Sequence, residues 1–566
     1  MITENEPRYS NNLAQRIFGF IVHHPKTLTI LSLCLMAALL SFLPGLAKDT
    51  RGDAFIAPDN PALLYREKVK QQFGLADPLV IALVHENANG VYQPSVMLLV
   101  DQLSHQVSLI DNVDPDRILS LATENNITGT SDGLDVDPFF DPYPTDQNDS
   151  ERIRQAINDF PLYQGKLVAR NGQATVIVVE MLDENQAEKT YHAVNDLLAK
   201  TSTPEGLSLH LAGEGAVAGF LGSYIDSDAS RLNPLAGLII TIIIGIAFRR
   251  VAPALLANVI IAASVLITLS MMSASSTPFF VITNALPVIL IGISVADAIH
   301  IFSHYYELQS QRPEHDKVLL VHESMVEMWR PITLTTLTTM AGFFGLYFAS
   351  AMPPFKFMGL FTALGVAIAW LFSMVFLPAA MAWSKPKVSQ KFVELQTTAR
   401  NDIFASLMTV LGRVSLNHAK TVVVVGAALM LVGGFSATRL IVDEDRIKTF
   451  HPSEPIYKAD QLINQHLDGS NNLDIVIETP NQEDLFKVEN LERIEALQEF
   501  ALSLPHVNNA TSIVDYLKQM NRVLNDGVKT QYRRPDESTA DAQYFLLYSA
   551  SSDPTDFEEE IDYDYQ

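Results

Sequence analysis

The chain has 566 residues, a formal net charge of −25, a mean hydropathy of +0.15 and one cysteine. A single cysteine excludes an intrachain disulfide scaffold, and 48% hydrophobic residues exclude a mainly disordered chain. The negative charge argues against a nucleic-acid-binding protein, because the phosphates would repel it. This length predicts several domains, and the mixture of apolar and acidic character indicates that the two kinds of residue occupy different stretches.

Seven stretches are apolar enough to cross a bilayer, which takes about 20 residues of helix. The first, residues 27–46, is predicted to be an uncleaved anchor, because it is longer than the apolar part of a signal peptide and no clear cleavage site follows it. The other predicted spans are residues 233–248, 251–272, 279–302, 332–351, 357–383 and 421–440. The predicted fold class is therefore a polytopic α-helical membrane protein.

Lysine and arginine in the short loops predict the orientation. Arg249 and Arg250 fill the turn after the second span, whereas the two short turns at the opposite ends carry only Lys356. We therefore expect a cytoplasmic N-terminus and two large exterior domains. These domains are acidic, since residues 47–230 hold 28 acidic against 12 basic residues and residues 441–566 hold 26 against 10.

The predicted organisation follows from these spans. It comprises a cytoplasmic N-terminus (1–26), a first span (27–46), a first exterior porter domain (47–231), spans two to six (232–384), a cytoplasmic linker (385–420), a seventh span (421–440) and a second exterior porter domain (441–566).

The first exterior domain alternates between strand-like and helix-like segments. The expected strands are residues 79–84, 117–121, 166–170, 174–182 and 207–212, and the expected helices are residues 94–110, 149–160 and 184–200. This β-α-β, β-α-β order predicts a ferredoxin-like α+β module. Residues 135–143, rich in Asp, Pro and aromatic residues, are expected to form a solvated loop; a calcium site there would lack the glycine and terminal glutamate of an EF-hand. In the second domain we expect a strand at 473–477 and a helix at 491–504.

The sequence contains an internal repeat. The residues His24-Pro25-Lys26-Thr27 return as His418-Ala419-Lys420-Thr421, and the same offset of 394 carries APDNP (57–61) onto HPSEP (451–455). The pattern predicts that a unit of one helix, one exterior domain and five helices begins again. Residue 566 corresponds to residue 172 of the first copy, so we expect a complete protein of this design to need an equivalent of residues 173–417.

Asp297 is the only acidic residue within the seven predicted spans. A carboxylate in hydrocarbon is costly, so Asp297 is predicted either to couple transport to an ion or to form a structural pair with another helix. His300 and His304 follow at i+3 and i+7, and all three residues share one helical face. We predict that His300 joins Asp297 in a proton relay, while packing or an interfacial position is the competing interpretation for both histidines.

The span at 332–351 is unusually rich in threonine. Thr335 and Thr339 share a face with Gly342 and are predicted to form a polar stripe that supports Asp297. The alternative is that each hydroxyl bonds a carbonyl of its own helix. Small residues in this span, Gly342 and Gly345, are expected to allow close helix approach.

The chain contains no nucleotide-binding motif, so no catalytic residue, metal site or cofactor is predicted. Any work that the protein performs is expected to draw on an ion gradient or on a partner.

These helices resemble a known family. The segment GISVADAIHIFSHYYE (292–307), followed by WRPITLTTLTTMAGFFGL (329–346), is similar to the fourth and fifth helices of the resistance-nodulation-division (RND) superfamily, and most similar to its MMPL-like exporter branch. Helices two to six of that branch resemble the sterol-sensing domain. The resemblance implies a proton-driven exporter of lipids or other hydrophobic compounds, with Asp297 as the proton carrier. Many relatives have Tyr after this aspartate where this chain has Ala298, and the family completes its relay with a tenth helix.

The resemblance also implies a setting. The expected location is a bacterial inner membrane with both large domains in the periplasm, and the expected energy source is the proton gradient, without a cofactor. The expected partners are a hydrophobic or lipid-like substrate and membrane lipids, with a periplasmic carrier protein as a further candidate. Two other interpretations are a non-transporting lipid sensor or scaffold, and a protein-secretion accessory of the same superfamily. No motif specifies the substrate or the oligomeric state.

Overall fold

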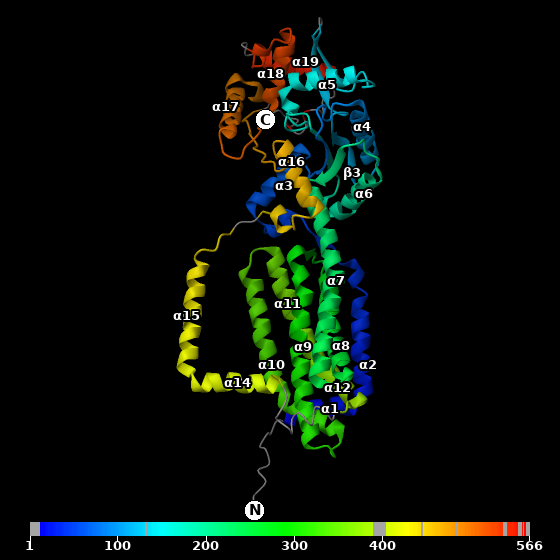
Figure 1. Cartoon of the computed structure of the whole chain (residues 1–566), viewed down its shortest axis with the longest axis vertical. Coiled ribbons are helices and arrows are strands. Elements are labelled where there is room, and N and C mark those ends of the chain that lie inside the picture. The colour runs from blue at the N-terminus through cyan, green and yellow to red at the C-terminus, as the bar shows by residue number, and fades with distance from the viewer. Residues whose placement is uncertain are drawn as a thin grey trace, which may run out of the picture. The chain divides into compact units, whose positions relative to one another are not determined.

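The computed structural model describes residues 12–130, 133–388, 403–442, 445–481, 484–535, 540–552, 557 and 560–561. Their chain trace is shown in Figure 1. The chain forms two compact units. The helical unit contains the described residues of 1–49, 54–56 and 224–444, and the mixed unit contains those of 50–53, 57–223 and 445–566.

Long apolar helices make up the helical unit. They are α1 (Asn12–His23), α2 (Pro25–Leu40), α7 (Glu214–Phe248, whose first ten residues belong to the mixed unit), α8 (Val251–Ala274), α9 (Ala285–Gln311), α10 (Lys317–Ala349), α11 (Pro353–Leu371), α12 (Leu377–Ser384), α14 (Ile403–Asn417) and α15 (Ala419–Ala437). A π-helical segment, Phe372–Phe376, joins α11 to α12. Among the described residues, seven helical segments are long and apolar enough to span a membrane, and each overlaps one of the seven predicted stretches, although α7 and α10 begin well before theirs.

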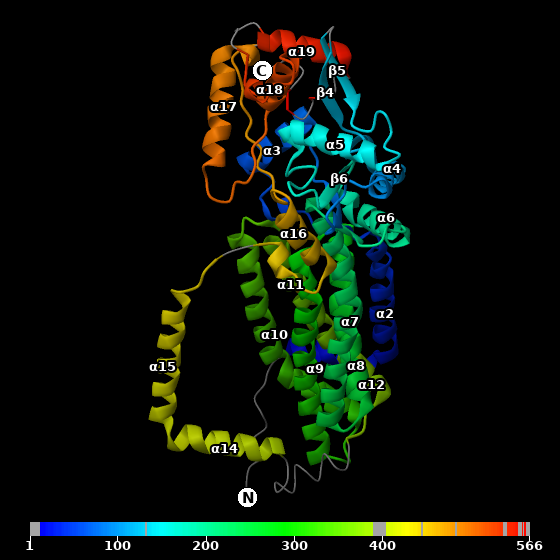
Figure 2. The ribbon, with the colours of Figure 1, turned by 45° about the horizontal axis from the view of Figure 1, so that its top comes forward.

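Helices α8 to α11 pack side by side around α9 (Figure 2). The face of α9 that points into this bundle is apolar and includes Leu290, Ile301 and Phe302, which are fully buried. Close approach between α10 and α11 depends on Gly359, where an added Cβ atom would lie 2.6 Å from the carbonyl oxygen of Phe343.

The prediction that the glycines of α10 allow close packing is therefore wrong. An added Cβ atom at Gly342 or Gly345 would meet nothing within 4 Å among the described residues. The small residue that permits the contact between α10 and α11 belongs to the neighbouring helix instead. Both glycines lie on a face of α10 that the described bundle leaves open.

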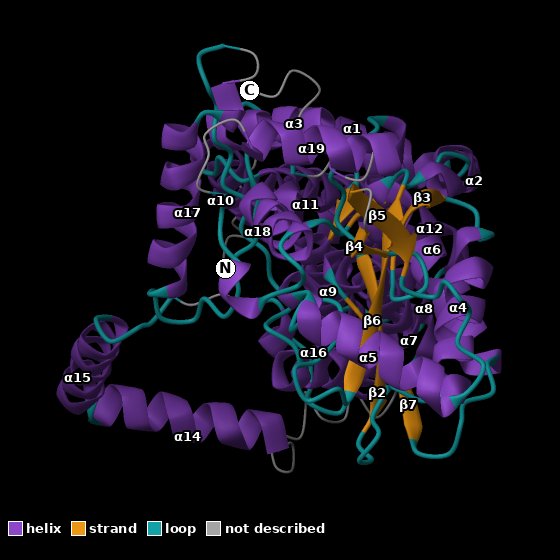
Figure 3. Ribbon diagram, turned by 90° about the horizontal axis from the view of Figure 1, so that it is seen from above, coloured by secondary structure: helices purple, strands orange, loops and turns teal. Residues whose placement is uncertain are grey.

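A four-stranded antiparallel sheet lies at the centre of the mixed unit (Figure 3). Its strands are β2 (Leu79–His85), β3 (Val113–Leu119), β6 (Ala174–Met181) and β7 (Leu207–Ala212), in the order β3-β6-β2-β7. Strands that are connected through a helix are not neighbours in the sheet. Helix α4 (Pro94–Ser108) connects β2 to β3, which have β6 between them, and α6 (Ala187–Lys200) connects β6 to β7, which have β2 between them. Both faces of β2 are covered, since all but one of its residues are buried.

Two predictions for this domain are wrong. Residues 133–138 form a strand, β5 (Gly133–Pro138), which pairs with β4 (Asn125–Thr130) in an antiparallel hairpin. The strand forms because Leu134 and Val136 are buried on one face while the intervening aspartates point outward. Residues 166–170 form a turn with isolated bridges at Val168 rather than a strand, and the N–H of Gly165 donates to the carbonyl of Val168 at 2.7 Å.

The later part of the mixed unit is helical where it is described. Its helices are α16 (Pro455–His466), α17 (Val488–Leu502), α18 (Ile513–Leu524) and α19 (Ala540–Ser551), while α3 (Pro61–Phe73) and α5 (Gln147–Asp159) come from the earlier part. The strand predicted at 473–477 does not form. Leu473 and Ile475 are exposed there, and no described strand lies alongside to pair with the backbone groups, which a strand requires.

The sequence repeat has a structural counterpart. Helices α2, α3 and α4 begin at residues 25, 61 and 94, and α15, α16 and α17 begin at residues 419, 455 and 488, each 394 positions later. His24, which precedes α2, and His418, which precedes α15, adopt nearly the same non-helical conformation. Their backbone angles are φ −116° and ψ 48° at His24 and φ −123° and ψ 35° at His418. The helices therefore repeat, whereas β2 has no equivalent strand in the second copy.

One short pair of strands belongs to the helical unit. The strands β1 (Lys48–Asp49) and β8 (Phe279–Phe280) run parallel, and Lys48 pairs with Asp226 at 2.7 Å. This arrangement ties the segment after α2 to the segment that precedes α9.

Candidate functional site

The candidate site lies on one face of α9. At every third or fourth position this face carries an exposed residue that is small or polar rather than large and apolar: Ala285, Gly292, Ala296, His300, Ser303 and Glu307, with Val288 as the exception. A helix surface that meets lipid tails is normally apolar and bulky. This face of α9 is therefore suited to water or to another protein segment.

Asp297 lies at the edge of this face and is half-buried. Within the described residues its carboxylate has no hydrogen bond and no ion pair, so the structural partner that was the competing interpretation is not found there. Its nearest neighbours along the helix, Ala296 and Ala298, cannot offer a side-chain donor. A group placed in this way can exchange a proton without first breaking a salt bridge.

The two histidines, His300 and His304, lie in different surroundings. His300 is exposed on the same face as Asp297 and has no described partner. His304 lies one turn further along α9, with its Nε2 atom 2.9 Å from a carboxylate oxygen of Glu327 on α10. The two atoms are close, but their geometry is not that of an aligned hydrogen bond. Sequence analysis missed Glu327, and only its place near the end of a predicted span could have indicated it.

The threonines of α10 bond mainly to their own helix. The hydroxyl of Thr335 donates to the carbonyl of Ile332 at 2.8 Å, and that of Thr339 donates to the carbonyl of Thr335 at 2.9 Å. Thr333 instead accepts a hydrogen bond of 3.0 Å from the indole of Trp370 on α11. No described hydrogen bond joins the stripe to Asp297. Because a hydroxyl has one proton to donate, Thr335 or Thr339 would have to turn away from these carbonyls before it could donate to a carboxylate.

Pro331 interrupts the hydrogen bonding of α10 next to this stripe. Because it lacks an N–H group, it cannot donate to the carbonyl of Glu327 one turn earlier. The interruption lies between the contact of Glu327 with His304 and the first threonines. The polar face of α10 thus begins at a local weak point of the helix.

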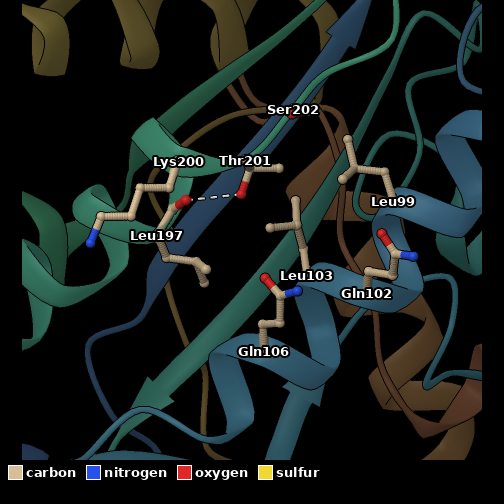
Figure 4. Close-up of a pocket in the computed structure, with 8 residues that line it drawn as sticks. All are labelled: Leu99, Gln102, Leu103, Gln106, Leu197, Lys200, Thr201 and Ser202. Carbon is tan, nitrogen blue, oxygen red and sulfur yellow. Dashed lines mark hydrogen bonds between the residues drawn. The ribbon is translucent and has the colours of Figure 1, made fainter.

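A separate cleft of about 280 Å³ lies in the mixed unit between α4 and α6 (Figure 4). Apolar side chains of Leu99, Leu103 and Leu197 and the polar ends of Gln102 and Lys200 line it. Ligand pockets usually hold about 300–1,000 Å³. The cleft is therefore too small to enclose a lipid, and we do not assign the substrate to it.

In the described part of the chain no group of three His, Cys, Asp or Glu residues is placed to hold a metal ion. The candidate site is thus a set of polar groups within membrane-spanning helices.

Seven apolar helices with a polar face around one carboxylate define a polytopic helical membrane protein. The model of the MMPL family matches residues 76–414, and the chain belongs to this family, a branch of the RND superfamily whose members are transporters. The chain is also similar to a protein of Methanocaldococcus jannaschii that is named only as a membrane protein. The two are 20% identical over 340 residues, which cover 58% of this chain and 83% of that protein. The resemblance predicted from α9 and α10 is confirmed.

Proposed function

We propose that this protein is a proton-coupled exporter of lipids or other hydrophobic and amphiphilic molecules, with Asp297 as the proton carrier. The observation that carries the proposal is the position of Asp297. It is the only acidic residue in the predicted spans, it lies on the small, polar face of α9, and it has no partner among the described residues. A costly group that packing does not explain is best explained by function.

The proposed mechanism starts from the two protonation states of Asp297. The neutral carboxyl tolerates apolar surroundings, whereas the carboxylate requires hydrogen-bond donors or a cation. Loss of the proton therefore favours an arrangement in which donors approach the polar face of α9. His300, exposed on that face, is proposed to pass the proton, and the hydroxyls of Thr335 and Thr339 are proposed to stabilise the charged state.

We propose that a change in the protonation of Asp297 moves α9 relative to α10. The two helices are in direct contact, and α10 has a local weak point at Pro331. A two-state shift of a few kcal/mol would be enough to link protonation to substrate movement. In this proposal the proton gradient supplies the energy, without a bound cofactor.

The mixed unit is proposed to handle the substrate. Its sheet order β3-β6-β2-β7, with α4 and α6 in the connections, supports assigning the first exterior domain to the ferredoxin-like class. We propose that both exterior regions lie in the periplasm of a bacterial inner membrane, where a carrier protein could receive the exported molecule. Export of lipid-like molecules is inferred from the family.

The test measures proton flux through the full chain in sealed vesicles. The wild-type chain and Asp297→Asn are reconstituted, a pH gradient is imposed, and an enclosed dye reports proton movement. We expect flux in the wild type and a fall to the level of empty vesicles in the variant, because asparagine cannot carry a proton. Glu307→Gln is the matched control, since Glu307 is an exposed acid further along the same face. Equal flux in wild type and Asp297→Asn would show that the assignment is wrong.

A further inference from the structure

Three lysines gather at one end of the helical unit. Lys317 is the first residue of α10, and Lys385 and Lys387 directly follow α12. Helices α10 and α12 contact each other, and the positive charges of Lys385 and Lys387 act on that of Lys317. Residues far apart in the sequence therefore place three cations together.

The segment that carries two of these lysines is held in place. The hydroxyl of Tyr305 on α9 donates to the carbonyl of Pro386 at 3.0 Å, and Tyr305 is fully buried. The backbone N–H of Val388 donates to the side-chain oxygen of Gln309 at 2.7 Å. These two bonds fix residues 385–388 against the end of α9. The lysines are thus part of an ordered surface.

The acidic residues near this cluster do not contact its lysines directly. None of the three lysines forms an ion pair within the described residues, although acidic residues are close in the sequence. The carboxylate of Asp316 accepts from the N–H of Val318 at the start of α10, and Glu323 pairs with Arg312 at 3.1 Å. Glu314 is an exposed residue of the same loop. Three like charges held together are favourable only when an anion joins them.

The two lysines that follow α12 lie next to the end of a candidate span. Trp383 is exposed in the last turn of α12, two residues before Lys385, at the end of the candidate span Pro353–Ser384. Tryptophan in membrane proteins is enriched at the boundary between hydrocarbon and headgroups. Residues just beyond that boundary lie at the level of the lipid phosphates. Lysine clusters in such positions attract anionic headgroups.

We propose that Lys317, Lys385 and Lys387 form a binding site for the phosphate headgroup of an anionic phospholipid. The site is separate from Asp297 and does not depend on the proposed transport. The bound lipid would be a resident of this surface rather than the exported substrate. It would hold the start of α10 to the end of α12 by bridging lysines of both segments.

The test compares lipid binding by the full chain in neutral detergent, measured by native mass spectrometry. The chain is titrated with dioleoylphosphatidylglycerol and, separately, with dioleoylphosphatidylcholine. We expect the wild type to prefer phosphatidylglycerol. The triple variant K317Q/K385Q/K387Q is expected to bind it on the order of a hundredfold more weakly, at about fivefold for each lysine. Binding of phosphatidylcholine is expected to be unchanged.

Two control variants distinguish the effect of losing this site from the effects of lower net charge and of unfolding. K68Q/K189Q/K448Q removes the same charge from exposed lysines of the mixed unit and is expected to keep the wild-type preference. K385Q/K387Q changes only exposed side chains, should melt as the wild type does, and is expected to lose about 25-fold in affinity. Unchanged affinity in both site variants would overturn the proposal. So would equal loss in the control variant, or displacement of the lipid by millimolar inorganic phosphate, which would identify a site for free phosphate.

Discussion

The imidazole Nε2 atom of His304 and the carboxylate of Glu327 lie 2.9 Å apart and join α9 to α10. This contact occupies one of the two histidines that share a helical face with Asp297. Because the imidazole of His304 already meets Glu327, the structure favours a packing role for His304, and His300 remains the only histidine of the pair open to the polar face of α9.

The first prediction concerns this contact. We expect Glu327→Gln to keep at least half of the wild-type proton flux, because Glu327 lies outside the proposed relay. Its side chain is more than half exposed, so loss of this contact should lower the free energy of unfolding by about 1 kcal/mol or less. Vesicle flux and thermal melting of the full chain check the two statements. A variant that folds normally but loses all flux would place Glu327 in the relay.

The second prediction concerns the threonine stripe. We expect Thr339→Val to reduce flux several-fold, because valine removes a hydroxyl from the proposed stripe while keeping the shape. The change in stability should be within about 0.5 kcal/mol, since the lost bond runs to the carbonyl of Thr335 in the same helix. Thr338→Val is the matched control, because its hydroxyl donates to that same carbonyl at 2.9 Å from a position off the stripe. Equal flux in both variants and the wild type would reduce the stripe to a packing feature.

The third prediction concerns an ion-pair network in the mixed unit. Lys70 lies 2.6 Å from Glu184 and 3.2 Å from Asp77, and it is largely buried. We expect Lys70→Met to lower the free energy of unfolding by about 3 kcal/mol, because Glu184 would lose its cation and Asp77 would keep only Arg66, at 3.0 Å. Lys68→Met, on the same helix but in an exposed contact of 3.7 Å with Glu478, should change it by less than about 0.5 kcal/mol. Thermal melting of the full chain tests the contrast, and equal shifts would contradict it.

The fourth prediction concerns pH. Burial raises the pKa of Asp541 above its ordinary value of 3.8, and the guanidinium of Arg534, at 3.3 Å, only partly opposes the rise. A carboxyl with a raised pKa in the folded state favours folding most when it is protonated. Its contribution to stability is therefore lost as the pH rises from about 3.8 through the folded-state pKa.

Replacing Arg534 should strengthen this dependence. We expect Arg534→Gln to lower the free energy of unfolding by about 3 kcal/mol at pH 7, where Asp541 would be buried and charged without a partner. The loss should be smaller at pH 4, where more of the carboxyl is protonated than at pH 7. Melting temperatures at both pH values check the result, with Asp541→Asn as the variant that cannot titrate. A penalty independent of pH would refute the assignment.

Sequence patterns predicted the membrane-spanning helices well, because each is decided by its own residues. Strands depend on neighbours instead. The segment 79–84 forms a strand between β6 and β7, whereas the similar segment 473–477 has no described strand beside it and stays irregular. Residues 133–138 were missed as a strand because only two apolar residues alternate with aspartates there.

The candidate site likewise has features that one helix decides by itself and features that depend on neighbouring helices. The position of Asp297 on α9 follows from helical periodicity alone. The contact of His304 with Glu327 and the bond from Trp370 to Thr333 depend on which helices are neighbours, and the sequence carries no signal for that. The extent of α10 was also underestimated, because the helix begins at Lys317 with an amphipathic segment that precedes the apolar stretch.

The repeated helices α2 and α15 are the first and the seventh candidate spans. Each crossing reverses the direction of the chain, so two spans with an odd number of spans between them run the same way, and five candidate spans lie between α2 and α15. The segments that follow α2 and α15 are then delivered to the same side of the membrane, where they can fold into the single mixed unit. The odd number of spans is thus a condition for assembly of that unit. Deletion of one span between them would separate its two parts across the bilayer.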